Sequence, residues 1–481
     1  MGEVKPKGIS TSLFVVAIII ALIIGVIAGY FVKPAAPAEV KTETITKTET
    51  IEKTVAVTAT PPTKKVSLTF WHHEAPAPRV AAFQAVIDEF MREHPNIEVK
   101  QEVITWGDAW VKIIEAVKAK NPPDLYMVLP ELAVTCYELE WDGKPAIVEV
   151  DDLIKELDEK YKFIPSVLEM SKIKGHYWSV PVWTMPLVLL YRPSYLEKYV
   201  GTKEPPKNWD ELLEYAKKCT HPEEEVWGIA LAAAKNLLTM EQVYPFFATV
   251  GAKIYNEKGE VVFYSPEAVR AAKYYSELLK YTPPGCTAWS WGEMKTTFYA
   301  GKIAMMPCYT TLRTLYERKD FDVAAAPIPP APDGKMITQQ YPNPIVIMRA
   351  TIDRGNYEAA KEFVRFLLRP DINGWLLAEL EAGCFSPPHE EGMKSPWFWS
   401  HYIAKAYPQI MQVDIDAIKY ASLYGFEYGC VNLGIGDIIG ESVLGDLVVR
   451  IYTGAMTPEE AVKWAHEQMV RFSEGKAIPT G

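Results

Sequence analysis

Residues 66–129 read VSLTFWHHEAPAPRVAAFQAVIDEFMREHPNIEVKQEVITWGDAWVKIIEAVKAKNPPDLYMVL, and their hydrophobic pattern determines the fold class. Apolar residues recur at helical spacing in two segments, and three shorter segments are rich in β-branched and aromatic residues. The pattern predicts alternating strands and helices at Val66–Phe70, Arg79–His94, Ile97–Val103, Asp108–Lys120 and Leu125–Leu129. Because such alternation is typical of a parallel sheet covered by helices, we expect an α/β fold.

The rest of the chain continues this pattern with more helix. Ser265-Pro266-Glu267 has the residues of a helix start, and Thr457 with Glu460 forms a capping-box signature for the last helix. Further helices are expected near 209–218, 292–299 and 356–368, and strands near 303–306 and 322–328.

The N-terminal region differs in composition from the rest of the chain. Residues 11–32 are apolar and uncharged, long enough to cross a bilayer, and a retained transmembrane anchor fits them better than a cleaved signal peptide. Residues 1–10 form a short basic head, in which residues 7–10 resemble a prepilin-type processing site. Residues 33–65 are rich in Thr, Lys and Glu, as expected of an extended stalk, although alternating Thr also fits a β-strand.

Composition excludes several classes of function. The formal net charge of −11 disfavours binding to nucleic acid. The six cysteines contain no C-x-x-C pair, so they indicate no zinc ribbon or thioredoxin motif; one or two disulfides and buried free thiols both remain open. The chain also lacks G-x-S-x-G, Walker A, H-E-x-x-H and G-x-G-x-x-G motifs.

We therefore expect no catalytic residues, no cofactor and no metal. The sequence His72-His73-Glu74 is the only histidine cluster, and adjacent strand positions point to opposite faces, which favours a polar loop over a shared metal.

Aromatic and acidic residues gather at the ends of the expected strands and in the loops that follow. In open α/β sheets the ligand crevice lies beyond the carboxyl ends of the strands. Flat rings suit the apolar face of a sugar, and carboxylates suit its hydroxyls, whereas core packing is the alternative for each ring. The candidate ligand-binding residues are Trp71, Glu74, Trp106, Asp108, Glu131, Trp183, Trp289, Trp291 and Tyr309.

The sequence resembles the family 1 extracellular solute-binding proteins, the maltose-binding-protein group of ATP-driven (ABC) importers. Five motifs occur in the order typical of that family. They are NPPDLY at 121–126, KGHYWSVP at 174–181 with LLYR at 189–192, PPKNWDEL at 205–212, FYAGKIAMM at 298–306 and AAKEFV at 359–364.

The resemblance implies a two-lobed periplasmic-binding-protein-like clamp of type II, here preceded by the transmembrane helix and the stalk. It implies three crossings between lobes near residues 183, 324 and 369. Lobe 1 would comprise residues 66–183 and 325–368, and lobe 2 residues 184–324 and 369–481. It also places Glu131, Trp183 and Tyr309 at the cleft, while Met185 stands where many members have an acid.

We expect a monomeric, single-pass membrane protein with an extracytoplasmic domain that captures a sugar or small oligosaccharide and delivers it to an ABC permease. The alternatives are the same clamp with a peptide or another non-sugar solute, and a tethered glycan-processing hydrolase. The hydrolase would need two carboxylates at a defined spacing across the groove.

Overall fold

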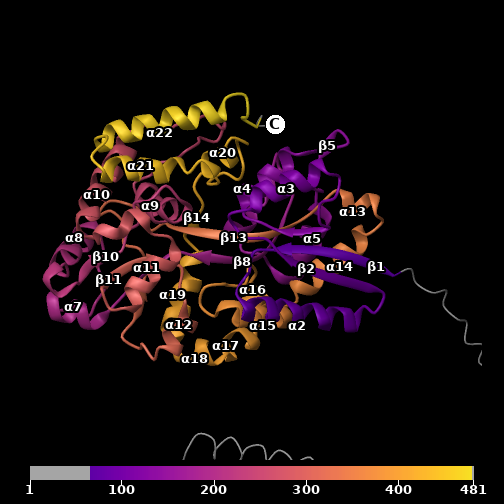
Figure 1. Cartoon of the computed structure of the whole chain (residues 1–481), viewed down its shortest axis with the longest axis horizontal. Coiled ribbons are helices and arrows are strands. Elements are labelled where there is room, and N and C mark those ends of the chain that lie inside the picture. The colour runs from indigo at the N-terminus through magenta and orange to yellow at the C-terminus, as the bar shows by residue number, and fades with distance from the viewer. Residues whose placement is uncertain (1–64, 479–481) are drawn as a thin grey trace, which may run out of the picture. The chain divides into compact units, whose positions relative to one another are not determined.

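The computed structural model describes residues 65–478 (Figure 1). The expected basic head, transmembrane anchor and stalk, up to residue 64, lie outside the described residues. Between residues 65 and 478, no helix combines the length and the apolar character needed to cross a bilayer.

A first sheet is built around residues 66–129. Its strand order is β14-β13-β3-β1-β2, and β8 pairs with β13. β1 is parallel to β2 and β3, as predicted, whereas β13 runs antiparallel to β3 and β8. The strands are β1 (Val66–His72), β2 (Ile97–Val103), β3 (Leu125–Met127), β8 (Val180–Pro186), β13 (Thr338–Ile347) and β14 (Ala421–Ser422).

The helices associated with this sheet confirm the predicted alternation. They are α2 (Ala77–Glu93), α3 (Ala109–Lys118), α4 (Pro130–Glu138), α5 (Asp151–Tyr161), α14 (Tyr357–Leu367) and α15 (Pro370–Glu381). One detail differs from the prediction: the third strand ends at Met127, and α4 begins at Pro130. Proline suits the first position of a helix because its fixed φ fits and the missing N–H would have had no partner there.

A second sheet has the order β10-β11-β9-β12. Its strands are β9 (Val188–Tyr191), β10 (Trp227–Ile229), β11 (Ile303–Cys308) and β12 (Ala324–Ala326). The helices nearby in Figure 1 are α7 (Pro193–Tyr199), α8 (Trp209–Lys218), α9 (Leu237–Thr249), α10 (Pro266–Leu278), α11 (Trp291–Tyr299), α21 (Val443–Tyr452) and α22 (Pro458–Ser473).

Both predicted helix starts of this half are confirmed. The Ser265 side chain accepts a hydrogen bond from the Ala268 N–H, and Thr457 forms a reciprocal capping box with Glu460.

Short elements complete the described chain. The helices are α6 (Pro165–Glu169), α12 (Leu312–Glu317), α13 (Ala350–Asp353), α16 (Glu390–Met393), α17 (Pro396–Ser400), α18 (Tyr402–Ala406), α19 (Pro408–Ile418) and α20 (Ile435–Gly440), with 3₁₀ turns at Pro222–Glu224, Leu279–Tyr281 and Pro284–Ala288. Two small hairpins pair β4 (Glu140–Trp141) with β5 (Lys144–Pro145) and β6 (Lys172–Ile173) with β7 (His176–Tyr177).

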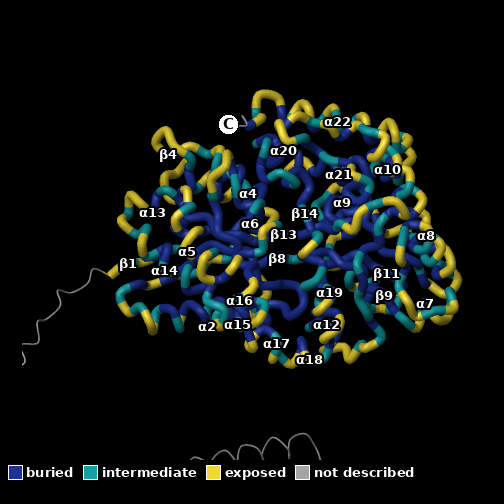
Figure 2. The backbone as a smooth tube through the Cα atoms, turned by 180° about the vertical axis from the view of Figure 1, so that it is seen from behind, coloured by how far each residue is buried: buried dark blue, intermediate teal, exposed yellow. Residues whose placement is uncertain are grey.

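The two sheets define two lobes, which the chain joins repeatedly. β8 ends in the first sheet at Pro186 and β9 starts in the second at Val188, while β12 and β13 make a return connection. Figure 1 shows β8 and β13 running side by side through the middle of the molecule. In Figure 2 the buried residues form the interior of both lobes and continue through this junction.

All six cysteines are buried free thiols in this structure. Of the two possibilities that the cysteine spacing left open, the structure therefore has buried free thiols and no disulfides within the described residues.

Candidate ligand-binding site

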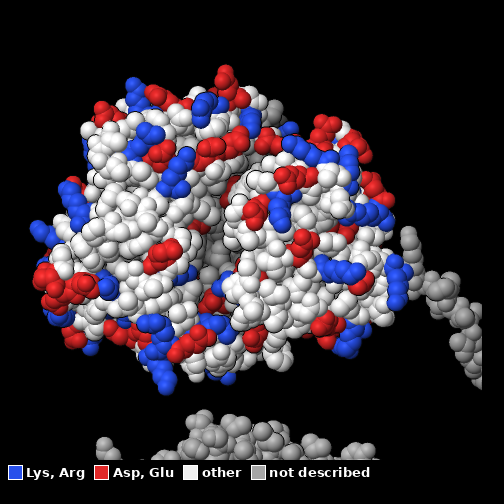
Figure 3. All heavy atoms as spheres, in the orientation of Figure 1, with Lys and Arg blue, Asp and Glu red and all other residues white. Residues whose placement is uncertain are grey.

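A cavity of about 400 Å³ opens where elements of both lobes meet. From the first lobe it is lined by residues after β1, β2 and β3, and from the second by residues of α9, α11 and the end of β11. β8 and β13 contribute Met185, Tyr341 and Asn343. Figure 3 shows the surface hollowed between the two lobes. The volume falls within the ~300–1,000 Å³ range of small-molecule sites.

Aromatic rings from both lobes line this cavity. Trp106, which follows β2, is 38% exposed and stacks on His73 with ring centroids 3.6 Å apart. On the other lobe, the ring centroids of Trp291 and Tyr309 lie 5.0 Å apart. Burial lowers the pKa of His73 to about 4, so Trp106 rests on an uncharged ring. The cavity therefore offers flat apolar surfaces on two sides.

The cavity also contains a paired set of charges near β1 and α2. Arg79 Nη1 lies 2.6 Å from Glu74 Oε2, and Arg79 Nη2 lies 3.0 Å from Glu381 Oε2. The guanidinium also packs over the ring of Phe385, 5.0 Å from its centroid. Burial raises the pKa of Glu74, and Arg79 opposes that rise. Glu74 thus reaches the cavity as one arm of an ion-paired triad.

Of the nine residues predicted to bind ligand, the structure brings four to the cavity, namely Glu74, Trp106, Trp291 and Tyr309. It places three of the tryptophans elsewhere. Trp183 lies inside β8, which continues to Pro186, so its ring is fully buried and packs against Phe385, 4.9 Å away between centroids.

The other two tryptophans outside the cavity have local packing roles. Trp71 lies within β1, and its Nε1 donates a hydrogen bond to Glu102 Oε2 on the neighbouring strand, at 2.8 Å. Trp289 is 6% exposed, and its carbonyl accepts a hydrogen bond from Asn236. A strand-end position therefore does not ensure that a ring faces the crevice.

Two predicted acids also lie away from the cavity wall. Asp108 lies at the start of α3, where it accepts a hydrogen bond from the Thr105 hydroxyl. Glu131 is fully buried in the first turn of α4, not in a loop, and Tyr341 donates a hydrogen bond to it at 3.3 Å. Burial raises the pKa of Glu131 to about 8. Glu131 is thus one layer behind Tyr341, which does line the cavity.

Several cavity residues were missed by the sequence reasoning: Arg79, Asn236, Glu241, Lys295, Tyr341 and Asn343. A signal existed for Glu241. It is the sole charged residue in α9, whose sequence is LLTMEQVYPFFAT and whose residues are almost all buried. An acid in such a helix calls for an explanation, because buried carboxyls are rare unless paired.

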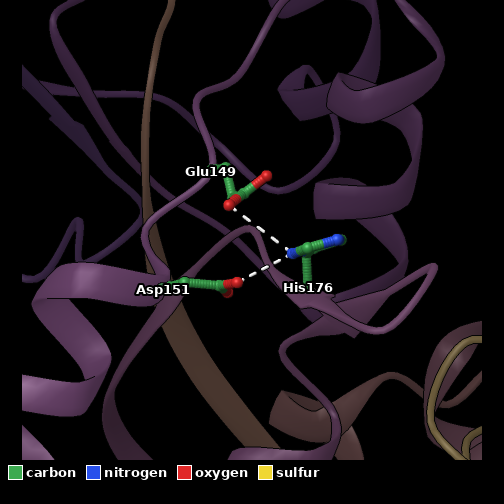
Figure 4. A group of neighbouring side chains, drawn as sticks. All are labelled: Glu149, Asp151 and His176. Atoms are coloured by element: carbon green, nitrogen blue, oxygen red, sulfur yellow. Dashed lines mark hydrogen bonds and ion pairs between the residues drawn. The ribbon is translucent and has the colours of Figure 1, made fainter.

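Outside the cavity, Figure 4 shows Glu149, Asp151 and His176 close together. His176 Nδ1 lies 2.7 Å from Asp151 Oδ2 and 3.5 Å from Glu149 Oε1. The second oxygen of Asp151 accepts a hydrogen bond from the Tyr177 N–H. These largely exposed side chains form ion pairs and hydrogen bonds with one another and with the backbone, as expected of an ion-paired surface cluster.

A cavity between two α/β lobes, with rings contributed by both, is typical of a two-lobed small-molecule-binding protein. Residues 75–373 match the family model described as bacterial extracellular solute-binding protein, and the chain belongs to this family. The resemblance stated from the five motifs is thereby confirmed. The family and the fold are those of solute-binding proteins.

Relatives of known description agree with this assignment. The chain is 25% identical over 398 residues to the putative ABC transporter periplasmic-binding protein YcjN of Escherichia coli, covering 81% of this chain and 88% of that protein. It is 26% identical over 324 residues to the maltotriose-binding protein of Pyrococcus abyssi, covering 65% of each. The structure of maltose-bound T. maritima MalE3 shares the fold, with a TM-score of 0.69 at 20% identity, covering 84% of this chain and 99% of that one.

Proposed function

We propose that this chain is the solute-binding component of an ABC importer, which captures a sugar or small oligosaccharide between its lobes and delivers it to a permease. The observation that carries the proposal is the cavity itself, where Trp106 from one lobe faces a site shared with Trp291 and Tyr309 from the other. Similarity to a maltotriose-binding protein supports a glycan as the ligand class.

The mechanism we propose is hinge closure. A ligand that touches both lobes favours the closed form, because only that form provides both sets of contacts. The rings would stack on the apolar faces of the sugar, and Glu74, Asn236 and Asn343 would bind its hydroxyls. A buried hydrogen-bonding group left without its partner costs ~1–3 kcal/mol, which gives such contacts their selectivity.

The division into lobes follows from the two sheets. We propose that the first two crossings lie between β8 and β9 and between β12 and β13, close to the positions near 183 and 324 inferred from sequence. α15 packs against α2 of the first lobe, while α19 packs against β9 and β12 of the second and also against β8 at the junction. We therefore propose a third crossing between α15 and α19, later than residue 369.

We further propose that residues 11–32 anchor the protein and that residues 33–65 act as a tether. Such a tether would hold a monomeric extracytoplasmic clamp close to its permease and raise the effective concentration of the pair.

Intrinsic tryptophan fluorescence and thermal shift, recorded on the globular region across a panel of neutral mono- and oligosaccharides, test the ligand class. We expect a saturable fluorescence change and an increased melting temperature with at least one sugar, because Trp106 and Trp291 line the site and bound ligand stabilises the folded state. A response to peptides with none to any glycan would show that the clamp serves another solute.

A further inference from the structure

One acidic side chain in the cavity has no structural explanation. Glu241 lies in the first half of α9 and lines the cavity, yet it is only 2% exposed. Its Oε2 atom is buried and has no hydrogen-bond partner within residues 65–478. No arginine or lysine lies within ion-pairing distance of it in that part of the chain, although the charge of Lys295 acts on it from farther away.

The neighbouring residue shows what a structural polar group in this helix looks like. The Gln242 amide donates to the carbonyls of Ala230 and Pro307 at 3.1 and 2.9 Å, and its oxygen accepts from the Ala232 N–H at 2.8 Å. Gln242 thus ties α9 to the second sheet with its donors and acceptor in use. Glu241 forms no such hydrogen bond between α9 and the second sheet within the described residues, so we look for its role in the cavity that it lines.

The surroundings of Glu241 disfavour a negative charge on it. Burial is the largest influence raising the pKa of Glu241, followed by electrostatic coupling to the Glu131 carboxyl of the first lobe, which disfavours ionising both groups together. The Tyr309 hydroxyl, the Trp291 indole and the Lys295 ammonium act in the opposite direction, more weakly. The buried Tyr341 and Tyr424 hydroxyls, hydrogen-bonded to each other at 2.6 Å, lie in the same cluster. An unpaired buried carboxylate is costly, and protonation removes that cost.

The other charged side chains that line the cavity differ in their pairing: Glu74 is paired with Arg79, whereas Lys295 forms no ion pair within residues 65–478. Arg79 is shared between Glu74 and Glu381, so it is not available to neutralise Glu241 or an anionic ligand. An incoming cation would meet no unpaired carboxylate other than Glu241 among the lining residues, and it would have to deprotonate Glu241 before pairing with it.

We propose that Glu241 is a specificity-determining residue that binds as a neutral carboxylic acid, giving and accepting hydrogen bonds with the hydroxyls of an uncharged sugar and disfavouring cationic sugars. This inference rests on the proposed function and narrows its ligand class. A carboxylic acid carries one donor and one acceptor, which match a hydroxyl group.

Two experiments on the globular region, residues 65–478, test this proposal. In the first, infrared difference spectra of wild type and Glu241→Gln at pH 7 report the protonation state of Glu241 directly, because the variant lacks that carboxyl. This measurement does not depend on whether a sugar is bound. We expect the difference spectrum to show loss of a protonated carboxylic C=O band. Loss of a carboxylate band instead would overturn the proposal, whatever the protein binds.

In the second experiment, calorimetry compares glucose, galactose and maltose with glucosamine and galactosamine. We expect a neutral sugar to bind at least tenfold more tightly than the amino sugars. Glu241→Gln should keep that affinity within about threefold, since an amide also donates and accepts, and Glu241→Ala should lose at least tenfold. Glu467→Gln, on the exposed face of α22, is the matched control and should leave binding unchanged.

The outcomes separate this inference from the proposed function. Preference for an amino sugar, with Glu241→Gln as weak as Glu241→Ala, would show that the ionised carboxylate binds and would overturn the inference while leaving a sugar receptor. Absence of binding by every sugar, with the protonated band present, would overturn the sugar assignment and with it the ligand class stated here.

Discussion

Replacing Trp106 with alanine tests whether the exposed ring of the first lobe is a ligand platform. Trp106 is 38% exposed and lines the cavity, with its hidden face on His73. For a tryptophan of ~250 Å², that exposure leaves about 95 Å² of surface. If a sugar covers about half of it, the hydrophobic gain at ~25 cal/mol per Å² is ~1.2 kcal/mol.

Ring stacking adds ~1 kcal/mol beyond the area effect, for a sum of ~2 kcal/mol. Since ~1.4 kcal/mol is a tenfold change, Trp106→Ala should weaken sugar binding about thirtyfold. Isothermal titration calorimetry measures this, with the best neutral sugar of the panel as ligand.

The control is Trp397→Ala, which removes a ring that is 55% exposed on α17 and does not line the cavity. Its affinity should equal that of wild type. If Trp106→Ala binds within twofold of wild type while its melting curve shows an intact fold, the ring is no platform and the stacking argument is refuted.

Four further outcomes follow from the structure. Arg79→Met should destabilise the fold by about 3 kcal/mol in urea titrations, because two buried carboxylates lose their shared cation. Asn208→Ala should cost ~1 kcal/mol by the same assay, since the side chain caps α8. Gly228→Ala should cost about 2 kcal/mol or more, because a Cβ would lie 1.8 Å from a backbone oxygen of α8. Hydrogen bonding to Asp151 raises the pKa of His176, so the pair stabilises the fold fully below the unfolded pKa of ~6.5 and loses this effect as pH rises through the folded pKa; NMR should show that pKa decrease in Asp151→Asn.

The architecture was predictable because it depends on short-range patterns. The alternation in residues 66–129 gave β1, α2, β2, α3 and β3 in the right order, and helix starts at Ser265 and Thr457 follow from local hydrogen bonds. β13 was not predicted, because its ten residues are all buried and its two prolines argue against a strand in the middle of a sheet. Only the assembled junction between lobes explains that strand.

The site was predictable only in part, because the direction of a side chain depends on where its strand ends. Trp106 and Trp183 were expected on the same argument, as rings that follow a strand. β2 does end at Val103, which leaves Trp106 beyond the sheet, whereas β8 continues to Pro186 and keeps Trp183 in the core. Trp106 lies three residues beyond the end of its strand and can meet ligand, whereas Trp183 lies three residues before the end of its strand and supports the wall.

Whether an acidic side chain reaches the cavity also depends on where helices begin and how they are placed, and the sequence-based expectation failed for two glutamates. Glu131 was expected at the cleft because it follows a strand, but α4 begins at Pro130 and buries it behind Tyr341. Glu241 was not expected because it lies within a helix, yet α9 meets the cavity with that residue. A carboxyl placed at the inner end of a helix, among rings and without an ion pair, can be kept only if protonation or a ligand supplies what the protein does not. Under the proposal that Glu241 is protonated, that requirement, more than the number of rings, makes the site between the two lobes selective.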